Sequence, residues 1–318
     1  MNILVIFTGG TIGSAVSDGW ISPSDDMKYL LLRKYSEKTG DLIQFDTLNP
    51  YTVLSENLSA EHLNKLIKCV RYNIDGCDGV IVTHGTDTLQ YSAAAVSYAM
   101  GTDCAPVLFV SSNYPLEDER ANGLDNFIAA VEFIKAKAGR GVYVSYKNGN
   151  QPVQIHYATR LLSHNECLDE VYSADHQPYA VFDGKILLND GFNPPDTVAA
   201  VEEPYFCDCS SVLTVVAMPG DSFSYDLSSV KAVILRPYHS GTLNTASVPF
   251  VSFCRRAADL DIPVFLVNAP EGITYDSSKV YDKLGIIALE GSVFPAVYVK
   301  IWLAVSQNKD ICGFVCNN

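Results

Sequence analysis

Positive charge is scarce in this sequence. Its 318 residues include 22 Lys and Arg against 36 Asp and Glu, which gives a formal net charge of −14. A protein that binds nucleic acid needs clustered Lys and Arg against the phosphates, and the sequence contains no such block, so nucleic acid is not an expected partner. Charged residues make up only 18% of the chain and hydrophobic residues 48%. The chain can therefore bury sizeable cores and is not expected to be disordered.

Long apolar runs and targeting segments are also lacking. The longest apolar region, residues 284–305, is interrupted by Glu290 and Lys300, which argues against a membrane-spanning helix. From Met1 the chain enters an apolar segment directly, without the basic region or cleavage site of a signal peptide. The sequence therefore predicts a cytoplasmic protein with no membrane partner.

Cysteines are present, but not in the arrangement that a metal site or a disulfide framework requires. The nine cysteines are an odd number spread over a large chain, which favours reduced thiols. The pairs Cys207/Cys209 and Cys312/Cys316 have neither the spacing of a zinc site nor a histidine nearby. We expect no metal and no cofactor.

The first feature that points to function is the apolar run Ile3–Phe7 and the loop after it. Five residues rich in Ile and Val are typical of a buried strand in a parallel sheet. The run ends in Thr8-Gly9-Gly10-Thr11, where two glycines let the backbone approach a ligand and the threonines offer hydroxyls. Ligands of open α/β sheets bind beyond the carboxyl ends of strands, where this loop lies. Taken alone, the loop is more typical of a plain glycine-rich turn than of a ligand site.

A second strand end carries a similar loop. The apolar residues 79–82 are followed by Thr83-His84-Gly85-Thr86-Asp87-Thr88, and a helix is predicted over 89–100. Asp87 and Thr88 are candidate caps of that helix, whose N-terminus favours negative charge. His84 and, in the second half of the chain, His239 are interpreted as structural. Two strand ends with glycine and hydroxyl residues make a ligand site more plausible than either loop alone.

Strands and helices alternate along the rest of the sequence. Further strands are predicted at 106–111, 141–145, 212–217, 232–235 and 264–267, and helices at 28–38, 59–72, 124–137, 248–260, 277–283 and 296–306, the last as the final helix. The segments 13–23 and 46–57 are predicted to be irregular, the first as a surface lid, and Asp183-Gly184 is predicted to turn a hairpin over 180–188.

This alternation predicts an α/β fold with two domains. We expect a larger N-terminal domain with a doubly wound parallel sheet over residues 1–190 and a smaller C-terminal α/β domain over 207–318. A Pro-rich linker is predicted over 191–206.

The two loops together resemble the two signatures of the bacterial-type L-asparaginases. Residues 112–116 with 120–123 also resemble that family's loop after the third strand, and residues 236–242 resemble a C-domain loop of its cytoplasmic, type I branch. The similarity covers essentially the whole chain. The resemblance implies hydrolysis of a side-chain amide through an acyl-enzyme, with threonine as the nucleophile.

The resemblance also implies roles for single residues. The nucleophile falls on Thr11 and the second catalytic threonine on Thr86, and Asp87 falls where the family binds the substrate α-amino group. In the tripeptide Ser55-Glu56-Asn57, Ser55 falls where the α-carboxylate is bound, and Glu56 belongs to the same substrate-binding set. The backbone N–H groups of Gly10 and Thr86 are candidate donors to the oxyanion.

Two positions depart from the family pattern. Arg160 occupies the place of a lysine that helps to deprotonate the second threonine, and arginine keeps its proton, so we expect it to orient Asp87. Lys147 is a weaker candidate for the same role. At the lid, Trp20 stands where some members have a tyrosine and has no hydroxyl to relay a proton. Tyr275, in a region that matches the tyrosine of other members, is the candidate partner of Thr11.

Two functions follow as hypotheses. The first is an L-asparagine amidohydrolase that releases aspartate and ammonia, acting as a homodimer or homotetramer with sites at subunit interfaces. The second is a homologue that binds an amino acid or amide but turns over slowly, because Arg160 and Trp20 weaken the catalytic machinery. An amidase for glutamine or another small amide is a variant of the first.

Overall fold

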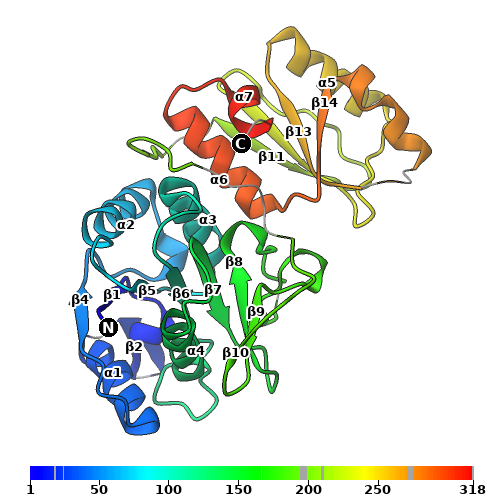
Figure 1. Cartoon of the computed structure of the whole chain (residues 1–318). Helices are drawn as coiled ribbons and strands as arrows, with labels where there is room; N and C mark the ends of the chain where they lie inside the picture. The colour runs from blue at the N-terminus through cyan, green and yellow to red at the C-terminus, as the bar shows by residue number, and fades with distance from the viewer. Residues whose placement is uncertain are drawn as a thin grey trace. The chain divides into compact units, whose positions relative to one another are not determined.

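The computed structural model describes residues 1–17, 19–23, 25–165, 167–193, 199–208, 211–270, 272 and 275–316. The chain forms two compact units, Met1–Pro204 and Tyr205–Asn318 (Figure 1). Residues 194–198 of the predicted linker lie outside the described residues.

The first unit contains an eight-stranded sheet. From one edge to the other, its strands are β4 (Phe45–Leu48), β1 (Ile3–Phe7), β5 (Gly79–Thr83), β6 (Val107–Val110), β7 (Val142–Tyr146), β8 (Val153–Tyr157), β9 (Ala180–Phe182) and β10 (Ile186–Leu188). The first five strands are parallel, and the last three continue the sheet with antiparallel pairing. The chain therefore passes from β1 outward to β4 and then crosses back to β5, which makes β1 the point where the strand order reverses.

Helices cover both faces of this sheet. Helices α1 (Asp25–Thr39) and α4 (Gly123–Lys135) contact each other on one face, and α2 (Ala60–Asn73) and α3 (Leu89–Met100) contact each other on the opposite face (Figure 1). Every residue of β1 is buried, and Ile3, Val5 and Phe7 share one apolar cluster with residues of α1 and α4. The structure thus confirms the doubly wound α/β fold, with a strand buried on both faces where the apolar run predicts one.

Helix α2 shows how local sequence sets an element. Its apolar residues Leu63, Leu66, Ile67 and Val70 are buried at helical spacing, as predicted. At its start, the Ser59 backbone N–H donates to His62 Nδ1 at 3.2 Å, so a histidine takes the place that Glu or Gln has in most capping boxes.

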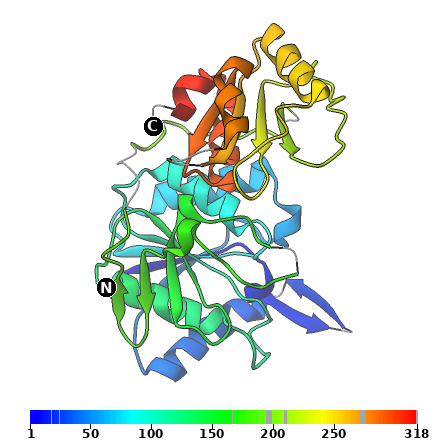
Figure 2. The same ribbon diagram turned by 90° about the vertical axis from the view of Figure 1, so that its right-hand side faces the viewer.

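Several short elements of the first unit differ from the prediction. The predicted irregular lid is a two-stranded hairpin, β2 (Ser14–Ser17) and β3 (Trp20–Pro23), which extends away from the sheet (Figure 2). The predicted irregular segment 46–57 contains edge strand β4 and a 3-10 turn, η2 (Ser55–Asn57). Strand β8 was not predicted, whereas the β9–β10 hairpin with Asp183-Gly184 in its turn is confirmed. β2, β3 and β4 mix polar and apolar residues without a regular pattern, so their backbone pairing alone identifies them as strands.

The second unit has its own four-stranded parallel sheet in the order β11 (Val212–Val216), β12 (Ala232–Arg236), β13 (Val264–Ala269) and β14 (Ile286–Glu290). Helices α5 (Val248–Asp259) and α6 (Phe294–Ser306) are confirmed. The prediction was wrong at three places. The apolar region 284–305 contains strand β14 before α6, residues 276–284 form 3-10 turns in place of an α-helix, and α7 (Ile311–Cys316) follows α6.

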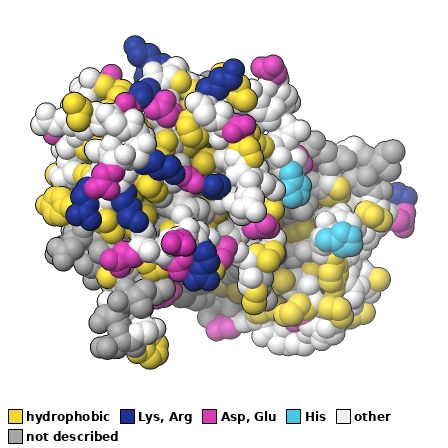
Figure 3. Space-filling view, turned by 90° about the horizontal axis from the view of Figure 1, so that it is seen from below, with side chains coloured by type: hydrophobic (Ala, Val, Ile, Leu, Met, Phe, Trp, Pro, Cys, Tyr) yellow, Lys and Arg dark blue, Asp and Glu magenta, His cyan; other side chains and the backbone are white. Residues whose placement is uncertain are grey.

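Charges on the surface are mixed in sign. On the face shown in Figure 3, Lys and Arg side chains lie beside Asp and Glu side chains. Exposed pairs such as Arg140–Asp103 at 2.6 Å and Lys65–Glu61 at 2.6 Å follow the same arrangement. None of the described helices is long and apolar enough to cross a membrane.

Candidate active site

Two parallel neighbours, β1 and β5, bring the two glycine-containing loops together. Phe7 pairs with Thr83, so the loops begin side by side at the carboxyl edge of the sheet, next to the point where the strand order reverses. The contact between the loops is made by glycines. A Cβ on Gly10 would overlap the backbone of Gly85, and Gly10 has φ 75° and ψ 178°, a conformation that other residues rarely adopt.

A third loop closes against the other two. The Gly10 N–H donates to the Val53 carbonyl oxygen at 3.1 Å, and the Val53 N–H donates to the Thr8 carbonyl oxygen at 3.1 Å. The chain then forms the 3-10 turn that carries Ser55, and a Cβ on Gly85 would overlap the Ser55 side chain. Three segments from distant parts of the sequence therefore converge at close backbone distance.

Hydroxyl and carboxylate groups gather at this convergence. The buried Ser55 Oγ donates to Asp87 Oδ2 at 3.1 Å, and Thr88 Oγ1 donates to the Ser55 carbonyl oxygen at 3.0 Å. Thr11 and Thr86 are half-buried, and Asp87 is exposed. A carboxylate that is held in place but open to solvent can receive an ammonium group beside two hydroxyls.

His84 lies in the second loop with its ring turned into the protein. Its side chain is buried, Nδ1 lies 2.8 Å from the Gly85 carbonyl oxygen, and the ring contacts Phe109 edge-on. Burial lowers the pKa of His84 to about 4, so it is neutral at pH 7. This placement supports the structural interpretation of His84.

His164 is a residue of this region that the sequence did not single out. Its imidazole is half-buried. Burial lowers the pKa of His164 below its usual value, while the Asp87 charge acts in the opposite direction.

The comparisons with known proteins agree on one family. Residues 2–191 match the family profile "Asparaginase, N-terminal". The chain is 31% identical over 331 residues to L-asparaginase 1 of Escherichia coli K12, covering 97% of this chain and 93% of that protein. It is 26% identical over 328 residues to one of the subunits of the glutamyl-tRNA(Gln) amidotransferase of Methanosarcina acetivorans, covering 97% of this chain and 75% of that protein.

The chain belongs to the asparaginase family. Its fold is also that of L-asparaginase I from Vibrio cholerae, with a TM-score of 0.82 at 19% identity over 99% of this chain and 96% of that one. An L-asparaginase from Thermococcus kodakarensis superposes with a TM-score of 0.81 at 21% identity, again over 99% and 96%. This protein is thus an asparaginase-family amidohydrolase.

The structure brings together part of the residue set that the family resemblance implies. Gly10, Ser55, Thr86 and Asp87 lie in the three converging loops, and Thr11 directly follows Gly10. In this asparaginase-family structure the Gly10 N–H already donates to Val53. An oxyanion role for this N–H would require that bond to be exchanged, which leaves the Thr86 N–H as the simpler candidate.

The other implied residues lie in different surroundings. Arg160 Nη2 contacts Asp175 Oδ2 at 3.0 Å, and its role as an orienter of Asp87 stays a prediction. Glu56 is exposed on the same turn as Ser55. Tyr275 is 58% exposed and belongs to the second unit, at the start of the 3-10 turn Asp276–Val280, so its pairing with Thr11 also stays a prediction. Trp20 is 78% exposed on β3.

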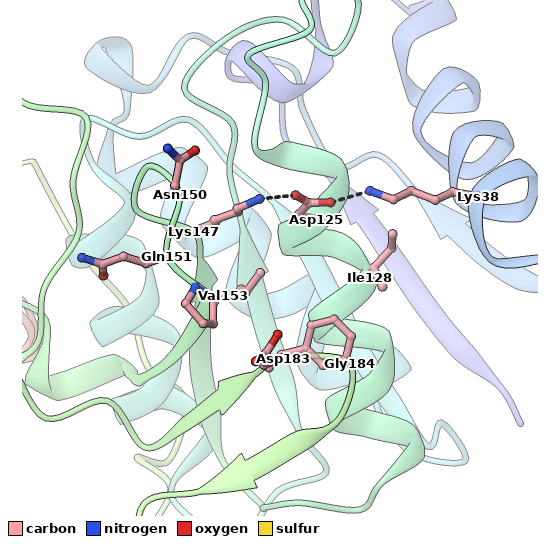
Figure 4. A pocket seen from close by; sticks show the side chains of 11 residues that line it. Lys38, Asp125, Ile128, Lys147, Asn150, Gln151, Val153, Asp183 and Gly184 are labelled. Atoms are coloured by element: carbon pink, nitrogen blue, oxygen red, sulfur yellow. Dashed lines mark hydrogen bonds and ion pairs between the residues drawn. The ribbon is translucent and has the colours of Figure 1, made fainter.

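Lys147, the weaker candidate for the family's lysine, is held elsewhere by an ion pair. Its Nζ lies 2.7 Å from Asp125 Oδ2, and Lys38 Nζ lies 2.6 Å from Asp125 Oδ1 (Figure 4). These three residues line a cavity of about 350 Å³ whose lining includes none of the three converging loops. Lys147 therefore has a structural partner away from Thr86.

Proposed function

We propose that this protein hydrolyses the side-chain amide of L-asparagine to aspartate and ammonia. The observation that carries the proposal is the Ser55–Asp87 hydrogen bond at the rim of the glycine-packed loops. An amino-acid substrate carries a cation and an anion on one carbon, and this pair offers a carboxylate and a hydroxyl at one place. The proposal assigns the α-ammonium to Asp87 and the α-carboxylate to Ser55, with Glu56 beside it.

In the proposed reaction, the Thr11 oxygen attacks the amide carbon while its proton passes to the phenol oxygen of Tyr275, which gives its own hydroxyl proton to the amide nitrogen. Tyr275 would reach Thr11 from the second unit or from another subunit of a homodimer or homotetramer. The tetrahedral intermediate places negative charge on the former carbonyl oxygen, where the Thr86 N–H donates. The C–N bond breaks, the nitrogen leaves as ammonia with the proton that Tyr275 relayed, and an ester with Thr11 remains. Water, activated at Thr86, then hydrolyses the ester to aspartate.

Ammonia release by the purified protein tests this proposal. We expect ammonia release from L-asparagine. The same assay with L-glutamine measures the preference between the two amides, because the glutamine side chain is one methylene longer and places its amide farther from the α-carbon. The Thr11→Ala variant serves as the background control. Binding of L-aspartate without release of ammonia from either amide would contradict the proposal and favour the alternative of a binding protein with weakened catalysis.

The Asp87→Asn change tests substrate recognition. Losing the carboxylate should remove a charge-assisted hydrogen bond to the α-ammonium, worth about 1.5 kcal/mol at an exposed site, or about a tenfold rise in the Kd of L-aspartate. Calorimetry with L-aspartate measures this affinity in both proteins. Asp103→Asn is the matched control, because Asp103 is an exposed carboxylate paired with Arg140. Equal aspartate affinity in the Asp87→Asn and unchanged proteins would leave Asp87 with only a role at the start of α3.

A further inference from the structure

Thr88 lies where a helix cap is expected, but its hydroxyl bonds to another loop. The residue occupies the N-cap position of α3, and its side chain accepts no hydrogen bond from the N–H groups of that helix, all of which the structure describes. An N-cap threonine ordinarily accepts from the second or third N–H of its helix. Here Thr88 Oγ1 instead donates to the Ser55 carbonyl oxygen at 3.0 Å, 33 residues away along the chain. The side chain therefore joins two of the three converging loops and does not cap its own helix.

Ser55 is held at the start of α3 by two hydrogen bonds that run in opposite directions. Its carbonyl oxygen accepts from Thr88 Oγ1, and its hydroxyl donates to Asp87 Oδ2 at 3.1 Å. Ser55 is also tightly packed, since it is 5% exposed and a Cβ on Gly85 would overlap its Oγ. Two consecutive residues, Asp87 and Thr88, thus hold both the side chain and the backbone of Ser55.

Only one of these two bonds can persist when an amino acid binds as proposed. A serine hydroxyl carries a single hydrogen, so it cannot donate to Asp87 and to a substrate carboxylate at the same time. The α-ammonium therefore replaces the Ser55 hydroxyl at Asp87, and the Ser55 hydrogen turns to the α-carboxylate. The bond from Thr88 to the Ser55 carbonyl oxygen survives this exchange, because neither of its two atoms is among the groups assigned to the substrate.

We propose that Thr88 is a positioning residue, which keeps Ser55 in place for the α-carboxylate while the Ser55 hydroxyl changes its partner. The inference rests on the proposed function and concerns how its substrate is recognised. Thr88 acts on affinity through Ser55 and touches no substrate atom. The Leu58 N–H also donates to the Ser55 carbonyl oxygen, at 3.1 Å, so loss of the Thr88 hydroxyl leaves that oxygen with a partner and the 3-10 turn formed.

The Thr88→Val variant tests the proposal, because valine has the branched shape of threonine and no hydroxyl. We expect the KM for L-asparagine and the Kd of L-aspartate to rise about three- to tenfold, the effect of one hydrogen bond, with kcat changed by less than about threefold. Thr88→Ala should behave like Thr88→Val, and it provides the same test if valine prevents folding.

Two further variants are the controls. Thr88→Ser keeps the hydroxyl, so both constants should stay within about twofold of those of the unchanged protein. Thr39→Val removes a hydroxyl that also donates to a backbone carbonyl oxygen, that of Tyr35 at 2.8 Å, and it should leave the affinity unchanged.

A double-mutant cycle with Ser55→Ala shows whether Thr88 acts through Ser55. Without the Ser55 hydroxyl there is no donor for Thr88 to position, so adding Thr88→Val to Ser55→Ala should change the Kd of L-aspartate by less than about twofold. A role confined to the start of α3 would give the same factor with and without the Ser55 hydroxyl, and that result would overturn the proposal.

Calorimetry separates failure of this inference from failure of the proposed function. If Thr88→Val binds L-aspartate as tightly as an unchanged protein that does release ammonia from L-asparagine, the role of Thr88 alone is overturned. If the unchanged protein binds L-aspartate but releases no ammonia, the proposed hydrolysis fails, and the comparison of Kd values still decides the role of Thr88. An unchanged protein that neither releases ammonia nor binds L-aspartate would overturn both.

Discussion

Replacing Thr11 with alanine is expected to reduce ammonia release from L-asparagine by about a thousandfold or more. Thr11 directly follows Gly10, the residue that packs against Gly85. Its hydroxyl is the proposed nucleophile, so alanine removes the atom that forms the acyl-enzyme. The measurements are kcat from initial rates and the Kd of L-aspartate by calorimetry. Aspartate affinity should remain measurable, because the Ser55–Asp87 pair is untouched.

A matched control for Thr11→Ala is available in the loop that packs on Gly10. Thr52 is an exposed threonine whose hydroxyl bonds to the Asn49 side chain, so Thr52→Ala makes the same chemical change without touching the proposed nucleophile. If Thr11→Ala keeps more than about a tenth of the activity, the assignment of the nucleophile is refuted, because loss of a nucleophile does not have so mild an effect.

The second large effect is expected at Gly10. In Gly10→Ala, the new Cβ would overlap the backbone of Gly85, and alanine would have to adopt φ 75° with ψ 178°. Such a conformation costs about 1–3 kcal/mol for a residue with a Cβ, before the overlap is counted. We expect a fall of at least about 2 kcal/mol in the free energy of unfolding, measured in urea, and an activity loss of about 100-fold or more, because the loops must separate.

Gly13 offers the control for Gly10→Ala within the same 3-10 turn. A Cβ on Gly13 meets nothing within 4 Å, so Gly13→Ala should change the free energy of unfolding by less than about 0.5 kcal/mol. Equal urea midpoints for the Gly10→Ala and Gly13→Ala proteins would show that close packing of the two loops does not stabilise the fold.

The main architecture could be predicted because its signals are local. β1 and β5 are continuous apolar runs, and α2 has apolar residues at helical spacing behind a cap, so each stretch indicates its own structure. The loops of Gly10 and Gly85 were also visible, since glycine and hydroxyl residues directly follow apolar strands. The sequence therefore determined the fold class and which strand ends to consider.

Elements that depend on a neighbour could not be predicted in the same way. β4 is an edge strand whose side chains are half-buried or exposed, and it is a strand because its backbone bonds to β1. The β2–β3 hairpin is likewise set by backbone pairing between two short segments that mix polar and apolar residues. At 276–284, residues predicted as an α-helix form 3-10 turns, since helix propensity is a weak preference that tertiary packing overrides.

The candidate site likewise has features that the sequence predicts and features that only tertiary contacts produce. Its glycines, threonines and Asp87 are found in the sequence, because two strands each deliver their loop directly. The register that pairs Phe7 with Thr83, the bond that engages the Gly10 N–H with Val53, and the hydrogen bond from Ser55 to Asp87 depend on contacts between residues far apart along the chain. Such contacts leave no periodic pattern in the sequence. The sequence by itself determined which loops are candidates for the site, and only the tertiary structure decided how they meet, because contacts between distant segments rather than local pattern hold Ser55 against Gly85 and Asp87.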